Sequence, residues 1–281
     1  MTQTTRNTLG PDVVGLPLAA TTFSYEERDV MLYALGVGAK ELEFIFERGL
    51  KTLPTFAVIP AFPALMGLSA AVEINPVMIL HGEQGFRIHK QIPTSGRLTT
   101  SGKVTGVYDK GKGALVTIDT DTTDDKGEPV FSNTSGIFIR GAGGFGGERG
   151  PEAGNVAPER APDKSVDMTT LDIQAAIYRL SGDRNPLHID PAFAKMAGYD
   201  RPILHGLCSF GHVGRAVLQE YAGNDTARFQ GLSVRFSGVV YPGDTITTDM
   251  WDEGNGKIIA QARTQDGRVV ISNAAAQVTP A

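Results

Sequence analysis

The sequence has one cysteine, Cys208, and one tryptophan among its 281 residues. A lone cysteine excludes an intramolecular disulfide and a thiolate metal cluster within the chain, as is common in a reducing compartment. No apolar run reaches the roughly 18 residues that a membrane span needs. The start, MTQTTRNTLGPDVVG, lacks a secretory pattern, and the end, QVTPA, lacks a peroxisomal tripeptide. We therefore expect a soluble protein of the cytoplasm with no membrane partner.

The chain also lacks an excess of basic residues. It carries 26 Lys and Arg against 31 Asp and Glu, which gives a formal net charge of −5 and a pI of about 5.6. This balance argues against nucleic acid as the main partner. An anionic small ligand stays open if a few basic residues gather locally. The hydrophobic content of 41% is that of a globular protein with a sizeable core.

Residues 141–164, GAGGFGGERGPEAGNVAPERAPDK, are rich in glycine, proline and charge and have no apolar periodicity, which predicts a linker. The first six match the dinucleotide pattern G-x-G-x-x-G after a strand-like stretch at 137–140. That motif needs a helix to begin at the glycines, so that the helix N-terminus faces a pyrophosphate. Closely spaced glycines and prolines follow instead. We therefore reject a nucleotide site here.

The two flanking halves resemble each other. Tyr33-Ala-Leu-Gly parallels Tyr178-Arg-Leu-Ser-Gly at an offset of 145, and Leu98 parallels Ile246 at an offset of 148. Two matches in order at nearly one offset suggest an ancient duplication. Each half reads as a helix followed by several strands, which predicts an α+β fold with two antiparallel sheet units. In the second half we predict a helix at 209–221 and strands at 232–240, 245–251, 257–264 and 269–277.

An acid, an amide and an imidazole lie within six residues, at Asp183, Asn185 and His188. Taken singly, Asp and Asn in Ser-Gly-Asp-x-Asn-Pro are ordinary turn residues that bond nearby backbone N–H groups. Their density favours chemistry, because a carboxylate and an imidazole held close can share one water and move protons in both directions. Gly206 follows at the mouth of the predicted helix and offers N–H donors to a developing oxyanion. Together they suggest addition or removal of water beside a carbonyl.

The neighbouring residues allow other interpretations. His205 and His212, with Asp183 and His188, invite a metal site, but the spacing matches no compact zinc motif and we predict none. We expect His205 to orient the turn before the helix and His212 to lie on the helix surface or at an interface. Cys208 is either a nucleophile with a pKa lowered by the helix N-terminus or a packing residue, and packing is favoured. The chain has no G-x-S-x-G elbow.

The string YRLSGDRNPLHIDPAFAKMAGYDRPILHGLCSFG resembles the hydratase-2 motif of the MaoC-like, double-hotdog enoyl-CoA hydratases. The blocks LPTFAVI, ILHGEQ, DKG, GAGGFGG, VYPGDT and VISNAA are similar to other parts of that family, close to the hydratase-2 region of peroxisomal multifunctional enzyme type 2. The resemblance implies two hotdog repeats, each a long helix wrapped by an antiparallel sheet. It divides the chain into an N-terminal hotdog at 1–147, a linker at 148–164 and a catalytic hotdog at 165–281.

The resemblance also implies an activity, the hydration of trans-2-enoyl-CoA to (3R)-3-hydroxyacyl-CoA without a metal or another cofactor. The first half is expected to accommodate the acyl chain and to carry no second active site, with the apolar stretch 57–71 lining a tail channel. An acyl-CoA thioester is the expected partner, and a homodimer is the expected assembly. The implied catalytic positions are Asp183 and His188, with Asn185 in support, Gly206 as the oxyanion donor and Glu47 as an acidic residue near the site. The implied substrate-binding positions are His81, Gly82, Lys110, Arg235 and Phe236.

Three alternatives remain at this point. The same site catalyses dehydration of a 3-hydroxyacyl-CoA, so sequence cannot set the direction. Hotdog folds also support thioesterases, although Asp-x-Asn-x-x-His argues against one. A non-catalytic acyl-CoA binding protein would bind without turnover. Our working assignment makes His188 the base toward water and Asp183 the acid toward the α-carbon, and the reverse order is also open.

Overall fold

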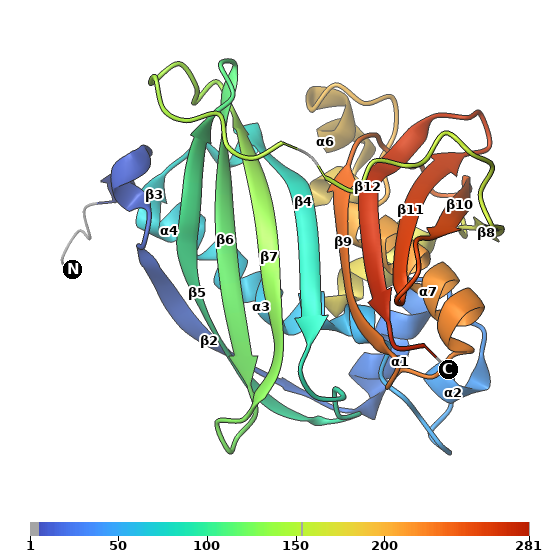
Figure 1. Cartoon of the computed structure of the whole chain (residues 1–281). Helices are drawn as coiled ribbons and strands as arrows, with labels where there is room; N and C mark the ends of the chain where they lie inside the picture. The colour runs from blue at the N-terminus through green and yellow to red at the C-terminus, as the bar shows by residue number, and fades with distance from the viewer. Residues whose placement is uncertain (1–5, 153, 281) are drawn as a thin grey trace.

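The computed structural model describes residues 6–152 and 154–280. Its main element is one ten-stranded antiparallel sheet with the order β2-β5-β6-β7-β4-β9-β12-β11-β10-β8 (Figure 1). A separate pair of two-residue strands, β1 (Asn7–Thr8) and β3 (Val72–Glu73), is parallel. The strands of the main sheet are β2 (Pro17–Tyr25), β4 (Ile79–Ile88), β5 (Gly96–Asp109), β6 (Gly113–Thr123), β7 (Pro129–Arg140), β8 (Lys164–Thr169), β9 (Phe229–Phe236), β10 (Thr245–Asp252), β11 (Lys257–Thr264) and β12 (Val269–Val278).

The strand order displays the duplication directly. Counted from the outer edge, the first half runs β2-β5-β6-β7-β4 and the second runs β8-β10-β11-β12-β9, which is the same topology twice. The two copies meet where β4 pairs with β9, with Glu83 opposite Arg235. Leu98 lies on β5 and Ile246 on the corresponding β10, as the predicted offset requires. The sheet is therefore continuous across the two repeats.

The helices lie on the far side of the sheet in the view of Figure 1. Helix α3 packs on β2 and β5, and the long helix α7 packs on β9, β10 and β12. The helices are α1 (Glu27–Gly36), α2 (Leu42–Ile45), α3 (Val58–Met66), α4 (Leu68–Ala71), α5 (Gln174–Tyr178), α6 (Pro191–Met196) and α7 (Gly206–Ala222), with short 3₁₀ turns η1 (Pro11–Val13), η2 (Pro54–Ala57), η3 (Pro76–Met78), η4 (Arg179–Ser181) and η5 (Pro186–His188).

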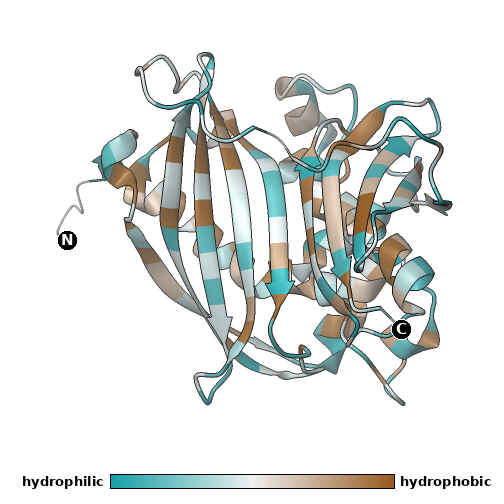
Figure 2. Cartoon of the chain, in the orientation of Figure 1, coloured by the Kyte–Doolittle hydropathy of each residue, from teal (hydrophilic) through white to brown (hydrophobic). Residues whose placement is uncertain are grey.

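One hydrophobic cluster joins the repeats, because it contains residues of α1, η2, α7 and the second sheet half together. Figure 2 shows apolar and polar residues alternating along the strands, which gives the sheet one face to bury. Helix α7 approaches the first half closely at two glycines. A Cβ on Gly211 would lie 2.3 Å from Val37, and one on Gly214 would lie 2.3 Å from Thr55. Larger residues at these positions would push the repeats apart.

The elements predicted for the second half are confirmed with small shifts. The helix begins at Gly206 and ends at Ala222, three residues earlier and one later than expected. Strand β9 lies at Phe229–Phe236, three to four residues before the predicted range. The other three strands start where predicted and end within one residue of the prediction. The apolar periodicity located these elements and left only their ends uncertain.

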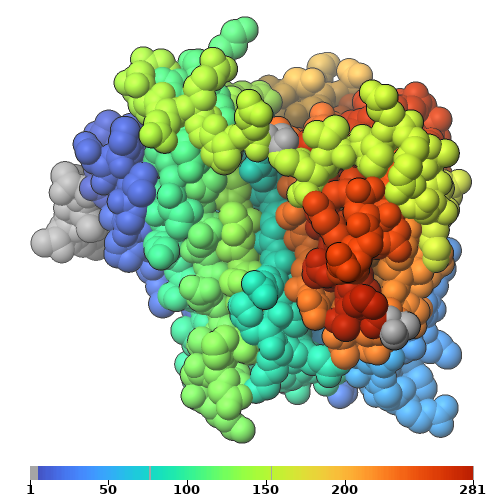
Figure 3. Space-filling view, viewed as in Figure 1, coloured from blue at the N-terminus to red at the C-terminus, as the bar shows by residue number. Residues whose placement is uncertain are grey.

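The glycine-rich segment after β7 has no helix among its described residues. Its backbone N–H groups at Gly144 and Gly146 donate to the carboxylate of Asp109 at 2.9 and 2.8 Å, as Gly111 does at 2.8 Å. These hydrogen bonds, the one from Gly144 foremost, lower the pKa of Asp109. The G-x-G-x-x-G pattern therefore cradles an anion supplied by the chain itself. Figure 3 shows the rest of this segment crossing the upper side of the molecule toward β8.

The expectation that no segment is long and apolar enough for a membrane span is corrected by the stretch Pro54–Ala71. By length and mean hydropathy it is apolar enough to cross a membrane, and 56% of it is buried inside the protein. Isolated polar residues such as Thr55 and Ser69 interrupt this stretch, so it contains no uninterrupted apolar run of that length. In the fold it forms η2, α3 and α4, and Val58, Ile59, Ala61, Ala64 and Leu65 are buried in the core.

Candidate active site

The acid-bearing segment is a pair of tight turns. Helix α5 ends in the turn η4, and Gly182 follows with φ +142°, a conformation that favours glycine. Asp183 comes next, and its Oδ1 accepts a hydrogen bond from the N–H of Asn185 at 3.1 Å. The side chain of Asn185 accepts from the N–H of Leu187 and caps η5. Asn185 thus holds the bend between the acid and the imidazole.

His188 ends η5 and is buried, with 8% of its surface exposed. Its Nδ1 lies 2.9 Å from the carbonyl oxygen of Ile203. A carbonyl only accepts hydrogen bonds, so Nδ1 carries the proton and Nε2 keeps its lone pair. Burial, the largest influence, lowers the pKa of His188, opposed by this hydrogen bond and by the charge of Asp183. The ring is therefore neutral and ready to accept a proton at neutral pH.

His205 lies directly on His188. The two ring centroids are 3.8 Å apart with 29° between the planes, and the ring centroid of Tyr178 lies 4.9 Å from that of His205. Nε2 of His205 donates to the backbone carbonyl of Asp183 at 3.1 Å. One ligand atom from each of Asp183, His188 and His205 lies within 4.8 Å of the other two. Sequence reasoning grouped His205 with Asp183 and His188 only as a metal site, which it rejected, and otherwise placed it at the turn before the helix.

The N-terminus of α7 completes the cluster from the second half. His205 is its N-cap, and Gly206 is the first helical residue, whose N–H is free of intrahelical bonding by geometry. A Cβ on Gly206 would lie 3.3 Å from the ring of Phe236 on β9. Phe236 in turn makes an edge contact with His81 of β4, with 5.3 Å between centroids. His81 therefore enters the site from the first repeat.

A buried polar network supports His81. Its Nε2 donates to Oε1 of Gln84 at 3.1 Å, and the same oxygen accepts from Ser135 at 2.9 Å. Gln84 donates onward to Asn133 at 3.0 Å. Burial lowers the pKa of His81 to about 4, against the opposing influence of Gln84 and of the Asp183 charge. Sequence reasoning missed this network, although polar residues at inward positions of two adjacent strands were its visible signal.

Other predicted residues are not drawn into the cluster. Glu47 lies in an exposed turn after α2. Figure 1 shows α2 at the lower edge of the molecule, whereas α6, the helix that follows His188, lies at the upper edge. The Nζ of Lys110 donates to the carbonyl of Arg149. Arg235 pairs with Glu83 across the β4–β9 junction. Glu47, Lys110 and Arg235 stay predictions. Gly82 sits at a strand irregularity between His81 and Glu83, beside the cluster.

The trio Asp183, His188 and His205 is also the group that offers ligand atoms for a metal in the described part of the chain. Its geometry fits a metal poorly. The two imidazoles are stacked, so their in-plane lone pairs run side by side and do not converge on one point. One nitrogen of each ring already donates to a backbone carbonyl. The arrangement suits proton transfer better than coordination.

For His212 and Cys208 on α7, the structure decides between the alternatives left open by the sequence. His212 lies at the interface between the repeats and not on the surface: it is 1% exposed, its Nε2 is 3.0 Å from where a Cβ on Gly38 would be, it donates from Nδ1 to the carbonyl of Cys208 at 2.9 Å, and burial lowers its pKa to about 4. The thiol of Cys208 does not gain acidity from the helix end, because burial raises its pKa well above the usual value. Its Sγ contacts the carbonyl of Gly36 at 3.2 Å. Complete burial between the repeats outweighs the helix dipole here, and the packing interpretation of Cys208 is supported.

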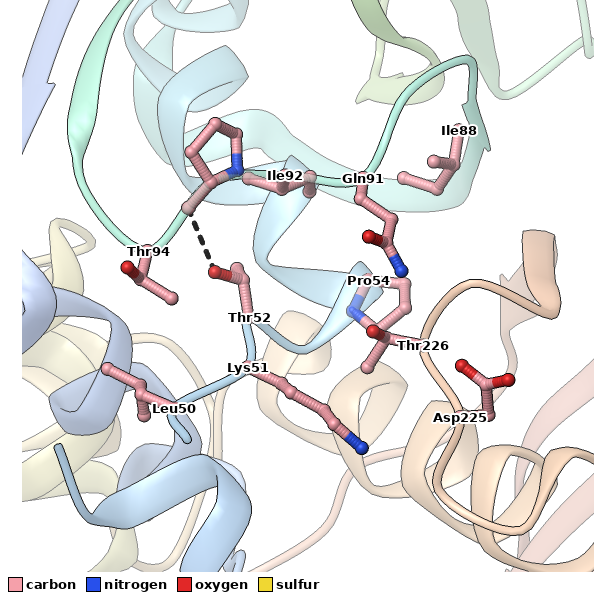
Figure 4. A pocket seen from close by; sticks show the side chains of 11 residues that line it. Leu50, Lys51, Thr52, Pro54, Ile88, Gln91, Ile92, Thr94, Asp225 and Thr226 are labelled. Carbon is pink, nitrogen blue, oxygen red and sulfur yellow. Dashed lines mark hydrogen bonds between the residues drawn. The ribbon is translucent and has the colours of Figure 1, made fainter. Parts of the chain in front are cut away.

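A pocket of about 350 Å³ lies apart from this cluster (Figure 4). It is formed where the loop before η2 meets the turn between β4 and β5 and the turn after α7. None of the clustered residues lines it. The lining residues are Leu50, Lys51, Thr52, Pro54, Ile88, Gln91, Ile92, Pro93, Thr94, Asp225 and Thr226.

Comparison with known proteins decides the family. Residues 23–141 match the MFE-2 hydratase 2 N-terminal domain, and residues 153–274 match the MaoC like domain. A probable enoyl-CoA hydratase 2 from Dictyostelium discoideum is 41% identical over 95% of this chain and 96% of its own length. The chain belongs to the MaoC-like hydratase 2 family. The crystal structure of a MaoC-like dehydratase from Phytophthora capsici superposes with a TM-score of 0.89 at 39% identity, covering 97% of this chain and 98% of that one.

These findings confirm the predicted family, the α+β double hotdog fold and the enzyme class, an enoyl-CoA hydratase. The peroxisomal hydratase-dehydrogenase-epimerase of Neurospora crassa is 46% identical over 94% of this chain, which spans 31% of that longer protein. The activities of that protein as a whole belong to a much longer chain.

The predicted cytoplasmic location is wrong. Relatives from Neurospora crassa, Mus musculus and Arabidopsis thaliana are named as peroxisomal, which points to that compartment. The prediction failed because a single cysteine and an acidic pI suit any reducing interior equally well.

Proposed function

We propose that this chain adds water to trans-2-enoyl-CoA to give (3R)-3-hydroxyacyl-CoA, with His188 and Asp183 as the catalytic pair. The observation that carries the proposal is the tautomer of His188. Its Nδ1–H is held by Ile203, which leaves the Nε2 lone pair for water, within reach of the Asp183 carboxyl group.

The chemistry follows from this pair. Nε2 of His188 takes a proton from water as the water oxygen bonds to the β-carbon of the enoyl thioester. The electron pair of the double bond moves toward the thioester oxygen. The proton passes from the His188 imidazolium to the Asp183 carboxylate and from there to the α-carbon, which restores a neutral His188 and an ionised Asp183. The reverse sequence is dehydration, so one site serves both directions.

Negative charge develops on the thioester oxygen during this step. The N–H of Gly206 opens α7, where backbone N–H groups and the helix dipole favour an anion. The aromatic ring of Phe236 lies against Gly206, 3.3 Å from where a Cβ on that residue would be.

We further propose how the chain and its assembly are organised. The N-terminal hotdog at 1–147 holds the acyl chain, residues 148–164 connect the repeats, and the hotdog at 165–281 carries the catalytic pair. The chain acts as a homodimer, with an acyl-CoA as its partner and neither a nucleic acid nor a membrane. Two hotdog units in one chain with exposed apolar residues at Leu35, Leu171 and Ile173 support a further association of copies.

The test follows the loss of enoyl-thioester absorbance with C4, C10 and C16 substrates, together with the chirality of the product. We expect hydration, (3R) product, and no release of free thiol. Release of thiol from saturated acyl-CoA would favour a thioesterase, and tight binding without turnover would favour a binding protein. Either result, or a (3S) product, contradicts the proposal.

A further inference from the structure

We propose that His205 is a positioning residue that holds Asp183 and His188 in register with the N-terminus of α7. The inference rests on the proposed hydratase function, which does not itself require His205. The imidazole of His205 would connect the turn that carries Asp183 and His188 to helix α7, which supplies the N–H of Gly206.

His205 contacts three parts of the candidate site. Its Nε2–H donates to the carbonyl of Asp183 at 3.1 Å, which ties down the backbone of the residue that bears the acid. Its ring covers His188 face to face at 3.8 Å. Its own backbone caps α7, with Gly206 next in the chain. A shift of the helix end therefore moves all three groups together, and a rigid His205 keeps them aligned.

The environment makes this ring a fixed neutral group. His205 is 1% exposed, and its Nδ1 has no hydrogen-bond partner among the described residues. The proton must reside on Nε2, because the carbonyl of Asp183 can only accept. Besides that carbonyl, the charged and titratable groups that face it are the Asp183 carboxylate, His188, Arg179 and Tyr178. Burial foremost, then the neighbouring His188, lowers the pKa of His205 to about 2.

Because burial lowers the pKa of His205 to about 2, its ring binds a proton too weakly to compete with His188 for the proton of water. It is therefore no second base, and its effect on turnover passes through the position of Asp183 and His188. Displacements of about 1 Å at such groups cost about 100-fold in rate. A substitution that keeps the hydrogen bond to Asp183 should retain more activity than one that keeps only the ring.

Two variants separate the contacts. His205→Phe keeps a flat ring against His188 and loses the donor, and it also removes the unpartnered Nδ1. His205→Gln keeps an N–H donor and loses the aromatic ring. We expect His205→Phe to lower kcat about 10- to 100-fold with KM nearly unchanged, and His205→Gln to recover part of that loss. Thermal unfolding of both variants shows whether they fold.

A second readout does not depend on turnover. Nitrogen-15 NMR of the imidazoles follows the titration of His188 in the wild type and in both variants. We expect the pKa of His188 to fall in His205→Phe, because the Asp183 charge that favours the imidazolium moves away, and to return toward wild type in His205→Gln.

Folded His205→Phe with wild-type kcat and an unchanged His188 titration would overturn the inference. Wild-type protein without hydratase activity would overturn the proposed function alone, because the NMR titration would still test the positioning role. An equal loss of kcat in both variants, with no change at His188, would also contradict it.

Discussion

The side chain of His188 and the backbone of Ile203 are joined by a 2.9 Å hydrogen bond that decides which nitrogen of the imidazole is free. Ile203 lies fifteen residues further along the chain, in the segment that leads into α7. The same short segment thus sets the tautomer of the base and, three residues later, supplies Gly206 as the oxyanion donor. Base and oxyanion site are fixed to one piece of backbone.

The catalytic pair is tested by removing each reactive group while its supporting contact is kept. His188→Asn retains an N–H near the position of Nδ1 and loses Nε2, and Asp183→Asn loses the acid. Each variant should lower hydration by about 100-fold or more, because both proton transfers are needed. Initial rates with a fixed enoyl-CoA give the measurement.

Asp190→Asn is the matched control for this pair. Its carboxylate caps α6 through the N–H groups of Ala192 and Phe193, and asparagine caps nearly as well. Near-normal hydration in Asp183→Asn or His188→Asn, or an equal loss in Asp190→Asn, would contradict the assignment.

The oxyanion role of Gly206 can be isolated with proline. Gly206 is the first residue of α7, where proline loses no intrahelical hydrogen bond, and His205 already has the extended backbone (φ −60°, ψ 136°) that a following proline requires. Gly206→Pro removes the N–H and should lower kcat by about 100- to 1,000-fold. Gly206→Ala keeps the N–H and meets Phe236 equally, so it separates crowding from the lost donor. Equal rates in the two variants would count against the N–H.

Buried His212 makes stability depend on pH. Its pKa is about 4 in the folded protein and near 6.5 when unfolded, so the unfolded chain binds more protons between these values. Stability is therefore highest above pH 6.5 and falls as the pH drops toward 4, by about 2 kcal/mol from this group between pH 7 and pH 5. Urea unfolding of His212→Asn should show a weaker dependence across that window. An identical slope in variant and wild type would exclude His212 as its source.

An ion pair connects α7 to the first repeat. Arg215 is 7% exposed and donates to both oxygens of Glu41 at 3.0 and 3.1 Å. Glu41→Gln should destabilise the protein by about 1–3 kcal/mol, because it leaves the Arg215 charge poorly compensated. Glu43→Gln removes a comparable but exposed pair with Lys51 at 3.8 Å and should change stability by less than about 0.5 kcal/mol. Equal effects in denaturant titrations would contradict this difference.

Cys208 provides a test of the nucleophile alternative. The thiol is fully buried against Gly36, and its pKa is raised by burial. Cys208→Ala should retain hydration within about threefold, since the thiol contributes packing alone. The folded wild type should react slowly with a thiol reagent that modifies the unfolded chain at once. Loss of activity on modification of the native protein, matched by Cys208→Ala, would revive the nucleophile.

Much of the fold was accessible from the sequence because its signals are periodic and repeated. Apolar alternation located the four strands of the second half, and the parallel between Tyr33 and Tyr178 revealed the duplication. In the fold these two rings meet, with 6.1 Å between centroids, where α1 packs on α5. The ends of β9 and α7 were less predictable, since terminal residues lack the full set of periodic contacts.

The candidate site also has one part that the sequence predicts and another that only the fold brings together. Asp183, Asn185 and His188 lie within six residues, so local turn chemistry already held them close, and the sequence by itself determined that an acid and an imidazole would meet. Only the tertiary structure brought His205 onto His188, placed His81 from the other repeat beside Phe236, and assigned Asp109 to the glycine cradle. These contacts depend on how the two halves of one sheet and helix α7 pack together, and spacing along the chain does not encode such distances. The tautomer of His188 belongs to this second group, because the carbonyl that sets it arrives with the packing of the segment before α7.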